Sequence, residues 1–411
     1  MYIILKPNVF LVKGAIKGCL YDFNTRNLYH LESHVVKMLE NIVNQHENNI
    51  KGTEEKKLIK EFIENNLLDR AEILCEKSIK SLSIERQAPD FAWIEVTTKC
   101  NLYCIHCYDS ASPIEVSVMN RDVFEKVCKF IKESSIKRIQ LIGGEPLLIK
   151  ETLREMICKI RKEVDFLEVF TNATLLTDSW ASFFSEHDIH VAVSVYSYKD
   201  TEHDKVTTVR GSHLKTNKGI ELLSRYNVPF RVCNVRMSGI EIGQPNTTLY
   251  TINRKKDIVR MAGRANFQLL SKDLIRQKII TESTFSVPLN QKISARLVQG
   301  HNCFGHKVYI SSVGEVYPCV MERRWSYGNL VDNFENTFNA VNNSVIPIKK
   351  DEIKSCSQCE FRYTCFDCRP NSLGGNLDEK PWYCTYVPEK GYWEKPDLFI
   401  KNLVKKYSNE G

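Results

Sequence analysis

Apolar and polar residues alternate with two different periods along the middle of the chain. Short runs rich in β-branched and aromatic residues are each followed by a segment with apolar residues at helical spacing. The expected strands are 91–96, 138–142, 167–170, 190–195 and 229–235, and the expected helices are 123–131, 151–164, 180–186 and 214–226. This alternation predicts βαβ units and a parallel sheet, whose functional residues lie at the carboxyl ends of the strands.

The first part of the chain has a different pattern. Expected strands at 2–5, 9–12, 18–21 and 28–31 precede two stretches of helical apolar spacing, 33–46 and 54–66. The pattern predicts a small module of strands and helices, followed by a linker at residues 81–90. Two interpretations remain open: a structural extension, or a winged-helix-like module whose sheet edge takes a peptide as an extra strand.

Composition narrows the class of protein. A chain of 411 residues with 43% hydrophobic residues supports two or three domains with sizeable cores. The absence of an 18-residue apolar run and of a signal peptide predicts a cytoplasmic protein without a membrane contact. The net charge of +7 permits an acidic partner, but basic residues spread along the helices favour a solvated surface over nucleic-acid binding.

Fifteen cysteines are the strongest compositional signal. In a cytoplasmic protein such a number favours metal or redox chemistry over disulfides. Ten of them form groups, at positions 100, 104, 107, 303, 319, 356, 359, 365, 368 and 384. The isolated ones are expected to be small buried residues, and they are Cys19, Cys75, Cys128, Cys158 and Cys233.

Three cysteines follow the expected strand 91–96, as Cys100, Cys104 and Cys107. Three thiolates are one fewer than a closed structural zinc site requires. They suit a 4Fe–4S cluster that leaves one iron open to another ligand. A loop with unrelated cysteines, or a zinc site with a remote fourth ligand, is the alternative.

The sequence Gly143-Gly144-Glu145-Pro146 directly follows the next expected strand. Taken alone it is a tight turn, in which two glycines allow a close approach to the backbone. Neighbouring parallel strands place their carboxyl ends together, so we expect this turn beside the cysteine loop.

The cysteine spacing followed by this turn resembles the radical S-adenosylmethionine (SAM) enzymes. The resemblance implies an α/β fold with a partial (β/α)6 barrel at residues 89–285, and a 4Fe–4S cluster held by the three cysteines of the loop. It implies that the open iron binds SAM, and that the reduced cluster cleaves SAM to a 5′-deoxyadenosyl radical that abstracts hydrogen. The implied SAM contacts are His106, Gly143, Gly144, Glu145, Asn172 and Ser194. Residues 260–264 resemble a late strand end of the same core, and no further catalytic residue is assigned.

The remaining seven grouped cysteines resemble the SPASM extension of these enzymes, here expected at residues 286–411. The resemblance implies two auxiliary 4Fe–4S clusters, one held by Cys356, Cys359, Cys365 and Cys384, the other by Cys303, Cys319 and Cys368. The second set lacks a ligand, for which His301, His306, water or a substrate thiolate are candidates.

The cysteine spacing within this extension departs from the usual pattern and leaves an alternative open. Two residues separate Cys365 from Cys368 where the family usually has three, which alters the local ligand geometry. By itself the group from Cys356 to Cys368 also fits a zinc knuckle.

SPASM enzymes include peptide maturases, and residues 1–88 resemble in size the precursor-recognition domains (RRE-like) found there. Residues 11–22 also resemble the start of maturases encoded beside ATP-grasp ligases. The expected function is therefore installation of a thioether, C–C or ether cross-link, or another oxidative modification, in a ribosomally synthesised (RiPP) precursor peptide. The partners would be that peptide and an electron donor such as flavodoxin or ferredoxin.

Three other functions fit parts of the pattern. A sulfatase-maturating type of enzyme would oxidise a Cys or Ser on a protein partner. An RNA-modifying radical SAM enzyme would use the net charge of +7 to bind RNA. A zinc-binding interaction protein would have no catalytic activity.

Overall fold

The computed structural model describes residues 1–74, 78–85, 88–114, 117–254, 257–301, 303–343, 348–372 and 376–408. Cys75 and two linker residues, 86 and 87, lie outside the described residues. The chain divides into two compact units. Unit 1 comprises Met1–Glu85, Ile279–Asn302 and Ile346–Phe399, and unit 2 comprises Arg86–Lys278, Cys303–Val345 and Ile400–Gly411.

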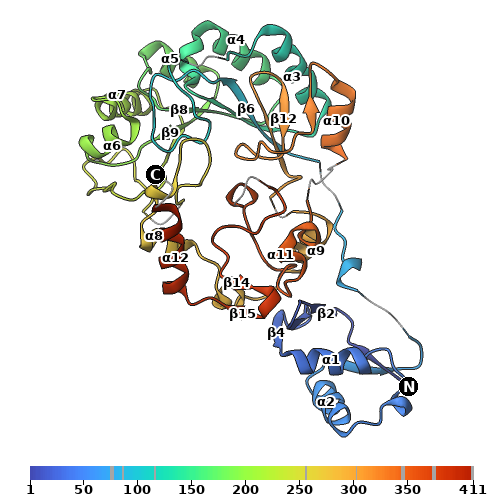
Figure 1. The fold of residues 1–411 in the computed structure, drawn as a ribbon. Helices are drawn as coiled ribbons and strands as arrows, with labels where there is room; N and C mark the ends of the chain where they lie inside the picture. The colour runs from blue at the N-terminus through green and yellow to red at the C-terminus, as the bar shows by residue number, and fades with distance from the viewer. Residues whose placement is uncertain are drawn as a thin grey trace. The chain divides into compact units, whose positions relative to one another are not determined.

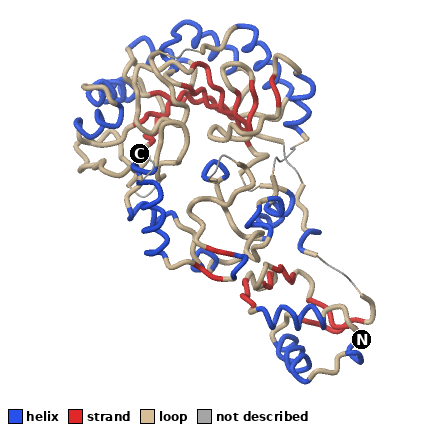
Figure 2. Tube along the Cα trace, in the orientation of Figure 1, coloured by secondary structure: helices blue, strands red, loops and turns tan. Residues whose placement is uncertain are grey.

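Unit 2 is built on one eight-stranded sheet, seen in Figures 1 and 2, with the order β10-β9-β8-β7-β6-β11-β12-β13. Its strands are β6 (Phe91–Thr97), β7 (Arg138–Gly143), β8 (Phe166–Thr171), β9 (His190–Ser194), β10 (Phe230–Cys233), β11 (Lys307–Ile310), β12 (Glu315–Tyr317) and β13 (Gly328–Asn329). All neighbours from β10 through β6 to β11 are parallel, and β12 and β13 continue antiparallel. The predicted α/β class and parallel sheet are confirmed. β11, which comes from the C-terminal region, was not predicted.

Helices cover one face of this sheet. They are α3 (Arg121–Glu133), α4 (Lys150–Ile160), α5 (Asp178–Glu186), α6 (Asp200–Thr207), α7 (Ser212–Arg225) and α10 (Phe334–Asn342), and α8 (Lys272–Lys278) follows in the chain. Figure 1 shows α3, α4, α5 and α7 along one side of the strands. Alternate strand residues such as Ile94, Leu141 and Val169 are fully buried in one core with these helices. The side chains between them therefore point to the opposite, inner face of the sheet.

The sheet continues weakly beyond β10. Arg236 and Ile258 form an isolated parallel bridge, and residues 260–264 follow as a turn. The expected late strand end is thus present as a bridge and a turn and not as a regular strand.

Unit 1 begins with the N-terminal module. β1 (Tyr2–Leu5) pairs antiparallel with β5 (Leu68–Ala71), and β2 (Val9–Lys13), β3 (Gly18–Asp22) and β4 (Asn27–Leu31) form a three-stranded antiparallel sheet. Helices α1 (Ser33–Ile42) and α2 (Thr53–Glu64) complete a separate hydrophobic core. The predicted strands and helices are confirmed, but α1 ends four residues before the expected position. Asn44 turns the chain there with a φ of 67°, a conformation that asparagine tolerates well.

Segments from the second half of the chain pack against this module. They contain α9 (Gln291–Gln299), α11 (Lys354–Ser357), β14 (Tyr386–Val387), β15 (Tyr392–Trp393) and the start of α12 (Pro396–Ser408). The buried Tyr21 hydroxyl donates to the Glu360 carbonyl oxygen at 2.8 Å, and the Ala15 amide donates to Gln358 O at 2.8 Å. The N-terminal module therefore shares one compact unit with these segments. Within the described residues, no helix combines the length and apolarity needed to cross a membrane.

Candidate active site

The loop after β6 brings its three cysteines together. Cys100, Cys104 and Cys107 are free thiols that share one small hydrophobic cluster with Leu102 and Ala111. The loop is also tied down by its backbone, because the Cys100 amide donates to Ser112 O at 3.0 Å and the Ile105 amide to Val206 O at 3.0 Å. The three thiols therefore lie together in one mostly apolar cluster on the loop that the sequence predicts.

Burial dominates the electrostatics of these thiols. It raises the pKa of Cys100 and of Cys104 to about 12, and the nearby Glu145 and neighbouring thiols add to the effect. The thiols therefore hold their protons at neutral pH when no metal is bound. Because iron binds the thiolate, metal loading of this loop must release protons.

The two glycines of the predicted turn approach the backbone of the β6 end. The Gly144 amide donates to Thr97 O at 2.7 Å and the Glu145 amide to Lys99 O at 2.7 Å. A Cβ atom would lie 2.1 Å from Thr97 O at Gly143 and 2.2 Å from Lys99 O at Gly144. Only glycine fits at such distances, and the close approach joins the β7 turn directly to the cysteine loop.

Glu145 joins the end of β7 to the end of β8. Its fully buried carboxylate accepts from the Thr171 hydroxyl at 2.6 Å, the Asn172 amide at 2.8 Å and the Leu147 amide at 3.1 Å. Burial raises its pKa to about 7, although these three donors act in the opposite direction. In this structure the Glu145 side chain thus orders the strand ends around the loop.

Asn172 connects the same strand end to the loop. Its side-chain amide donates to Asn101 Oδ1 at 2.9 Å, and its Oδ1 accepts from the Thr174 amide at 2.9 Å. Asn101 in turn donates to the Thr174 hydroxyl at 2.8 Å. Three polar side chains therefore fix the first turn of the cysteine loop against β8.

Tyr196, which the sequence analysis missed, links three of the predicted residues. Its ring packs edge-on against His106 with centroids 4.8 Å apart, and its hydroxyl interacts with both Ser194 and the Cys104 thiol. His106 Nδ1 is buried without a hydrogen-bond partner. Burial and then Arg264 lower the pKa of His106 to about 4, so its imidazole is neutral. A neutral ring with an unsatisfied nitrogen is suited to a bound ligand.

Residues 263 and 264 close the loop from the other side. The Arg264 amide donates to Cys107 O at 3.0 Å, and its Nε donates to Cys104 O at 2.9 Å. Gly263 has a φ of 58°, and a Cβ there would lie 2.2 Å from Cys107 O. Sequence spacing alone did not predict this contact. The glycine between Arg260 and Arg264 is the local sequence feature that agrees with it.

A comparison with protein families extends this description of the site. Residues 94–242 match the family model for the radical SAM superfamily. The chain therefore contains a radical SAM domain. The antilisterial bacteriocin subtilosin biosynthesis protein AlbA of Bacillus subtilis (strain 168) is 26% identical over 333 residues, which cover 74% of this chain and 72% of AlbA.

Two further similarities were found. A cysteine-type anaerobic sulfatase-maturating enzyme of Clostridium perfringens (strain ATCC 13124) is 23% identical over 360 residues, covering 74% of this chain and 96% of that enzyme. Among solved structures, Streptococcus suis SuiB bound to S-adenosylmethionine covers 90% of this chain and 96% of its own, with 12% identity and a TM-score of 0.48.

The inner face of the radical SAM sheet carries a buried polar group that the sequence analysis did not predict. Glu95 on β6 accepts from the Tyr309 hydroxyl on β11 at 2.5 Å and from the Ser312 hydroxyl at 2.7 Å. Arg323 lies 3.1 Å from Asp109 and 3.9 Å from Glu95. Burial and the proximity of Glu95 raise the pKa of Asp109, whereas hydrogen bonds from Tyr309 and Ser312 outweigh burial and lower that of Glu95.

A second group of thiols lies in unit 1. Cys356, Cys359, Cys365 and Cys384 line one cavity together with Lys350, Lys380 and several apolar side chains. All four are free, and burial raises the pKa of each of them. The set that surrounds this cavity is the one that the sequence assigned to a complete auxiliary cluster, so the donors fit such a group.

The other predicted auxiliary ligands are divided between the units. Cys303 and Cys319 belong to unit 2, where Cys319 packs near Tyr309 and Val320, and Cys368 belongs to unit 1. His301 Nε2 contacts Asp367 Oδ1 at 3.2 Å, so this nitrogen already has a protein partner. Across the described ranges, no three Cys, His, Asp or Glu side chains converge tightly enough to hold one metal ion.

The isolated cysteines only partly follow expectation. Cys19 is fully buried, whereas Cys128, Cys158 and Cys233 are half-buried. The prediction of full burial is wrong for these three, because Cys128 and Cys158 lie at the border of the helix-covered core and Cys233 lies on the last strand of the sheet.

Proposed function

We propose that this radical SAM enzyme is a maturase that oxidatively modifies a ribosomally synthesised precursor peptide. The observation that carries the chemistry is the cysteine loop, in which three buried thiols are held together and joined to the ends of β7 and β8. The support for the substrate class is the relationship to AlbA, which is named for the biosynthesis of a bacteriocin and aligns with 74% of this chain.

We assign the cluster and SAM contacts as follows. Cys100, Cys104 and Cys107 would hold the SAM-binding 4Fe–4S cluster, which would supply the electron that cleaves SAM to methionine and a 5′-deoxyadenosyl radical. The unsatisfied Nδ1 of His106 supports a contact with SAM. The remaining assigned SAM contacts are Gly143, Gly144, Glu145, Asn172 and Ser194.

The chain's own residues would organise this chemistry. The apolar surroundings of the loop exclude water from the reacting atoms. The glycine turn and the Glu145 carboxylate keep the strand ends at fixed distances from the thiols. The inner-face carboxylates Glu95 and Asp109 lie on the same side of the sheet as the aromatic residues Trp93 and Tyr309.

Auxiliary clusters in a SPASM domain at residues 286–411 form the second part of the proposal. The cavity lined by Cys356, Cys359, Cys365 and Cys384 supports one of them. Cys303, Cys319 and Cys368 would hold the other, with its open position available to a substrate group. Electrons would come from a flavodoxin or ferredoxin in the cytoplasm.

Residues 1–88 would bind the leader of the precursor. The three-stranded sheet of this module has the order β2-β3-β4, so β2 and β4 are its edges. An extended peptide can add to such an edge through its backbone hydrogen bonds. This mode of binding needs no catalytic side chain, in agreement with the absence of such a cluster from the module's sequence.

SAM cleavage tests the central assignment. Protein reconstituted anaerobically should contain iron and sulfide and form 5′-deoxyadenosine from SAM and a reductant. Replacing all three loop cysteines by Ala should abolish this product. A triple variant that still cleaves SAM, or a protein that contains zinc and little iron, would contradict the assignment.

The substrate is tested separately, with the peptide encoded by a short reading frame next to the gene. Mass spectrometry should show loss of a pair of hydrogen atoms from the core peptide after turnover. Hydrogen exchange should slow at β2 or β4 when the peptide is bound, because new backbone hydrogen bonds form there. Saturating peptide without any change in residues 1–74 would exclude leader binding by this module.

A sulfatase-type maturation is the second candidate, since a sulfatase-maturating enzyme is 23% identical over 360 residues. It predicts oxidation of a single Cys or Ser in a peptide that lacks any leader. Deleting residues 1–88 is a poor way to separate the two functions. The deletion would also remove Tyr21, which is hydrogen-bonded to the segment that carries the four cysteines of the second group.

A further inference from the structure

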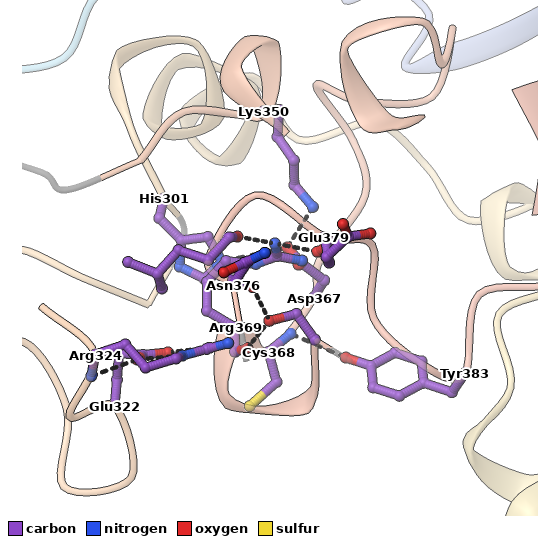
Figure 3. Close-up of polar contacts among 12 residues, drawn as sticks. His301, Glu322, Arg324, Lys350, Asp367, Cys368, Arg369, Asn376, Glu379 and Tyr383 are labelled. Carbon is purple, nitrogen blue, oxygen red and sulfur yellow. Dashed lines mark hydrogen bonds and ion pairs between the residues drawn. The ribbon is translucent and has the colours of Figure 1, made fainter. Parts of the chain in front are cut away.

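Asp367 is the centre of a fully buried group of charges in unit 1. Figure 3 shows Lys350, Arg369 and His301 around its carboxylate. Lys350 Nζ and Arg369 Nη2 each form an ion pair with one carboxylate oxygen, and His301 Nε2 lies 3.2 Å from Oδ1. The side chains of all four residues are at most 1% exposed.

The group carries an excess of positive charge. Lys350 and Arg369 contribute two cations, and Asp367 contributes one anion. Arg369 is further fixed by Nη1, which donates to Leu377 O at 2.9 Å and to Glu379 O at 2.8 Å. Burying an excess charge is costly unless another negative group lies nearby.

A site for such a negative group adjoins Lys350. Lys350 lines the same cavity as Cys356, Cys359, Cys365 and Cys384. Lys380 also lines this cavity, and its Nζ donates to Tyr386 O at 2.9 Å. Four thiolates with a 4Fe–4S core carry net negative charge, so the buried Lys350 lines a site that an anionic cluster would occupy.

We propose that Lys350 raises the reduction potential of the centre held by these four cysteines, and that Asp367 positions Lys350 for this role. Reduction adds one negative charge to the centre. A fixed cation at the wall of a cavity of low dielectric stabilises the reduced form more than the oxidised form. The inference rests on the proposed assignment of the four thiols as cluster ligands.

The chain spacing agrees with this role. Asp367 is one of the two residues between Cys365 and Cys368, where the usual SPASM spacing has three. It therefore comes from the ligand loop itself and carries its carboxylate to Lys350, which lies in the short 3-10 helix Lys350–Glu352. The other residue of the pair, Phe366, is 61% exposed and makes no such contact.

The test is a redox titration of the reconstituted full-length protein, followed by electron paramagnetic resonance. The signal of the four-thiol centre is identified by its loss in Cys359→Ala. Lys350→Met should shift the midpoint potential of this signal to lower values, and Lys350→Arg should retain a potential close to that of the wild type. If Lys350→Met does not fold, Lys350→Gln keeps an N–H donor for Asp367 and removes the same charge.

Lys354→Met is the matched control, because Lys354 is four residues away, 63% exposed and paired with Asp378 and Glu379. The midpoint potential of the four-thiol centre in Lys354→Met should equal that of the wild type, since solvent screens the exposed charge. An unchanged potential in the folded, iron-replete Lys350→Met or Lys350→Gln variant would overturn this inference and leave the proposed function intact. Absence of any signal that depends on Cys359 would overturn both the ligand assignment and the role of Lys350.

Discussion

Arg264 contacts the cysteine loop twice, through its backbone amide and through its guanidinium. The Nε bond to Cys104 O is 2.9 Å long, and the guanidinium carbon lies 3.9 Å from the centre of the Tyr103 ring. A charged hydrogen bond and a cation–π contact together contribute about 2–3 kcal/mol at a partly buried site. Arg264 therefore stabilises the loop without being a ligand.

Replacing Arg264 by Ala should loosen this loop. We expect a severalfold decrease in 5′-deoxyadenosine formation and faster loss of iron from the SAM-binding cluster during dialysis against a chelator. Arg225→Ala is the control, because its ion pair with Asp178 is 65% exposed on both sides and contributes little. Equal behaviour of the two variants would show that the Arg264 contacts are not needed.

His203 introduces a dependence of stability on pH. It is buried, its Nδ1 accepts from the Tyr196 amide at 3.3 Å, and burial lowers its pKa from 6.5 to about 4. Between these two pH values the unfolded state binds more protons than the folded state. Stability is therefore complete above pH 6.5 and decreases as the pH falls towards 4.

Urea denaturation of the metal-free protein measures this effect. From pH 7 to pH 5, His203 should account for a loss of about 2 kcal/mol in the free energy of unfolding. His203→Gln should show a shallower loss over the same range. A variant with the same pH dependence as the wild type would rule out His203 as a contributor.

At the scale of elements, the radical SAM site depends on how closely strand ends approach one another. Gly143, Gly144 and Gly263 each bring one backbone segment so close to another that no Cβ atom fits. The contacts join the β7 turn to the β6 end, and residues 263–264 to the cysteine loop. Because these are contacts between backbone atoms, the three positions require glycine for one reason, which is that it has no Cβ atom.

Gly144→Ala tests this packing. The new methyl would lie 2.2 Å from Lys99 O, so the turn must move away from the loop. We expect SAM cleavage to fall more than about tenfold, with a destabilisation of about 2 kcal/mol from the forced shift. Iron content of the SAM-binding cluster and product formation are the measurements.

Gly211→Ala is the matched control for this change. Gly211 has a φ of 79°, but no atom lies within 4 Å of its would-be Cβ. The control therefore introduces backbone strain of about 1 kcal/mol without steric overlap. If both alanine variants lose SAM cleavage equally, the approach to Lys99 does not explain the loss.

At the scale of the whole molecule, unit 1 combines segments that are far apart in the sequence. The first 85 residues share it with residues 279–302 and 346–399. Tyr21 is fully buried at this contact, and its hydroxyl donates to Glu360 O, one residue after the predicted ligand Cys359. The N-terminal module therefore supports the segment that carries the four-thiol cavity.

Tyr21→Phe removes one buried hydrogen bond and preserves the packing of the ring. We expect the unfolding transition of unit 1 to lose about 1 kcal/mol, and the four-thiol centre to lose iron faster under a chelator. Tyr29→Phe is the control, since among the described residues the Tyr29 hydroxyl has only an exposed contact of 3.5 Å to Asn27. SAM cleavage, which is proposed for the cysteine loop of unit 2, should be unchanged in both variants.

Much of this organisation could be read from local sequence. Strands such as 138–142 and 167–170 are short runs of strand-forming residues, so their positions were predicted within a residue or two. The spacing of Cys100, Cys104 and Cys107 is local as well, because three ligands on one loop need no distant partner. The same holds for Cys356, Cys359 and Cys365.

Other features depend on distant parts of the chain. β11 is short, and its pairing with β6 joins residues more than 200 positions apart. The buried contacts of Arg264, Tyr196 and Arg323 are of the same kind, because a single polar residue carries no periodic signal. Their partners are set only when the strands and turns have packed.

The sequence by itself determined the α/β core, the N-terminal module and both groups of thiols, since periodicity and ligand spacing are properties of neighbouring residues. Tertiary structure alone decided that Glu145 orders the strand ends and that Lys350 meets Asp367 beside four thiols. It also decided that the first 85 residues share a unit with the four-thiol segment. Buried charges find their partners across the fold, and a low dielectric makes those distant pairings strong enough to matter.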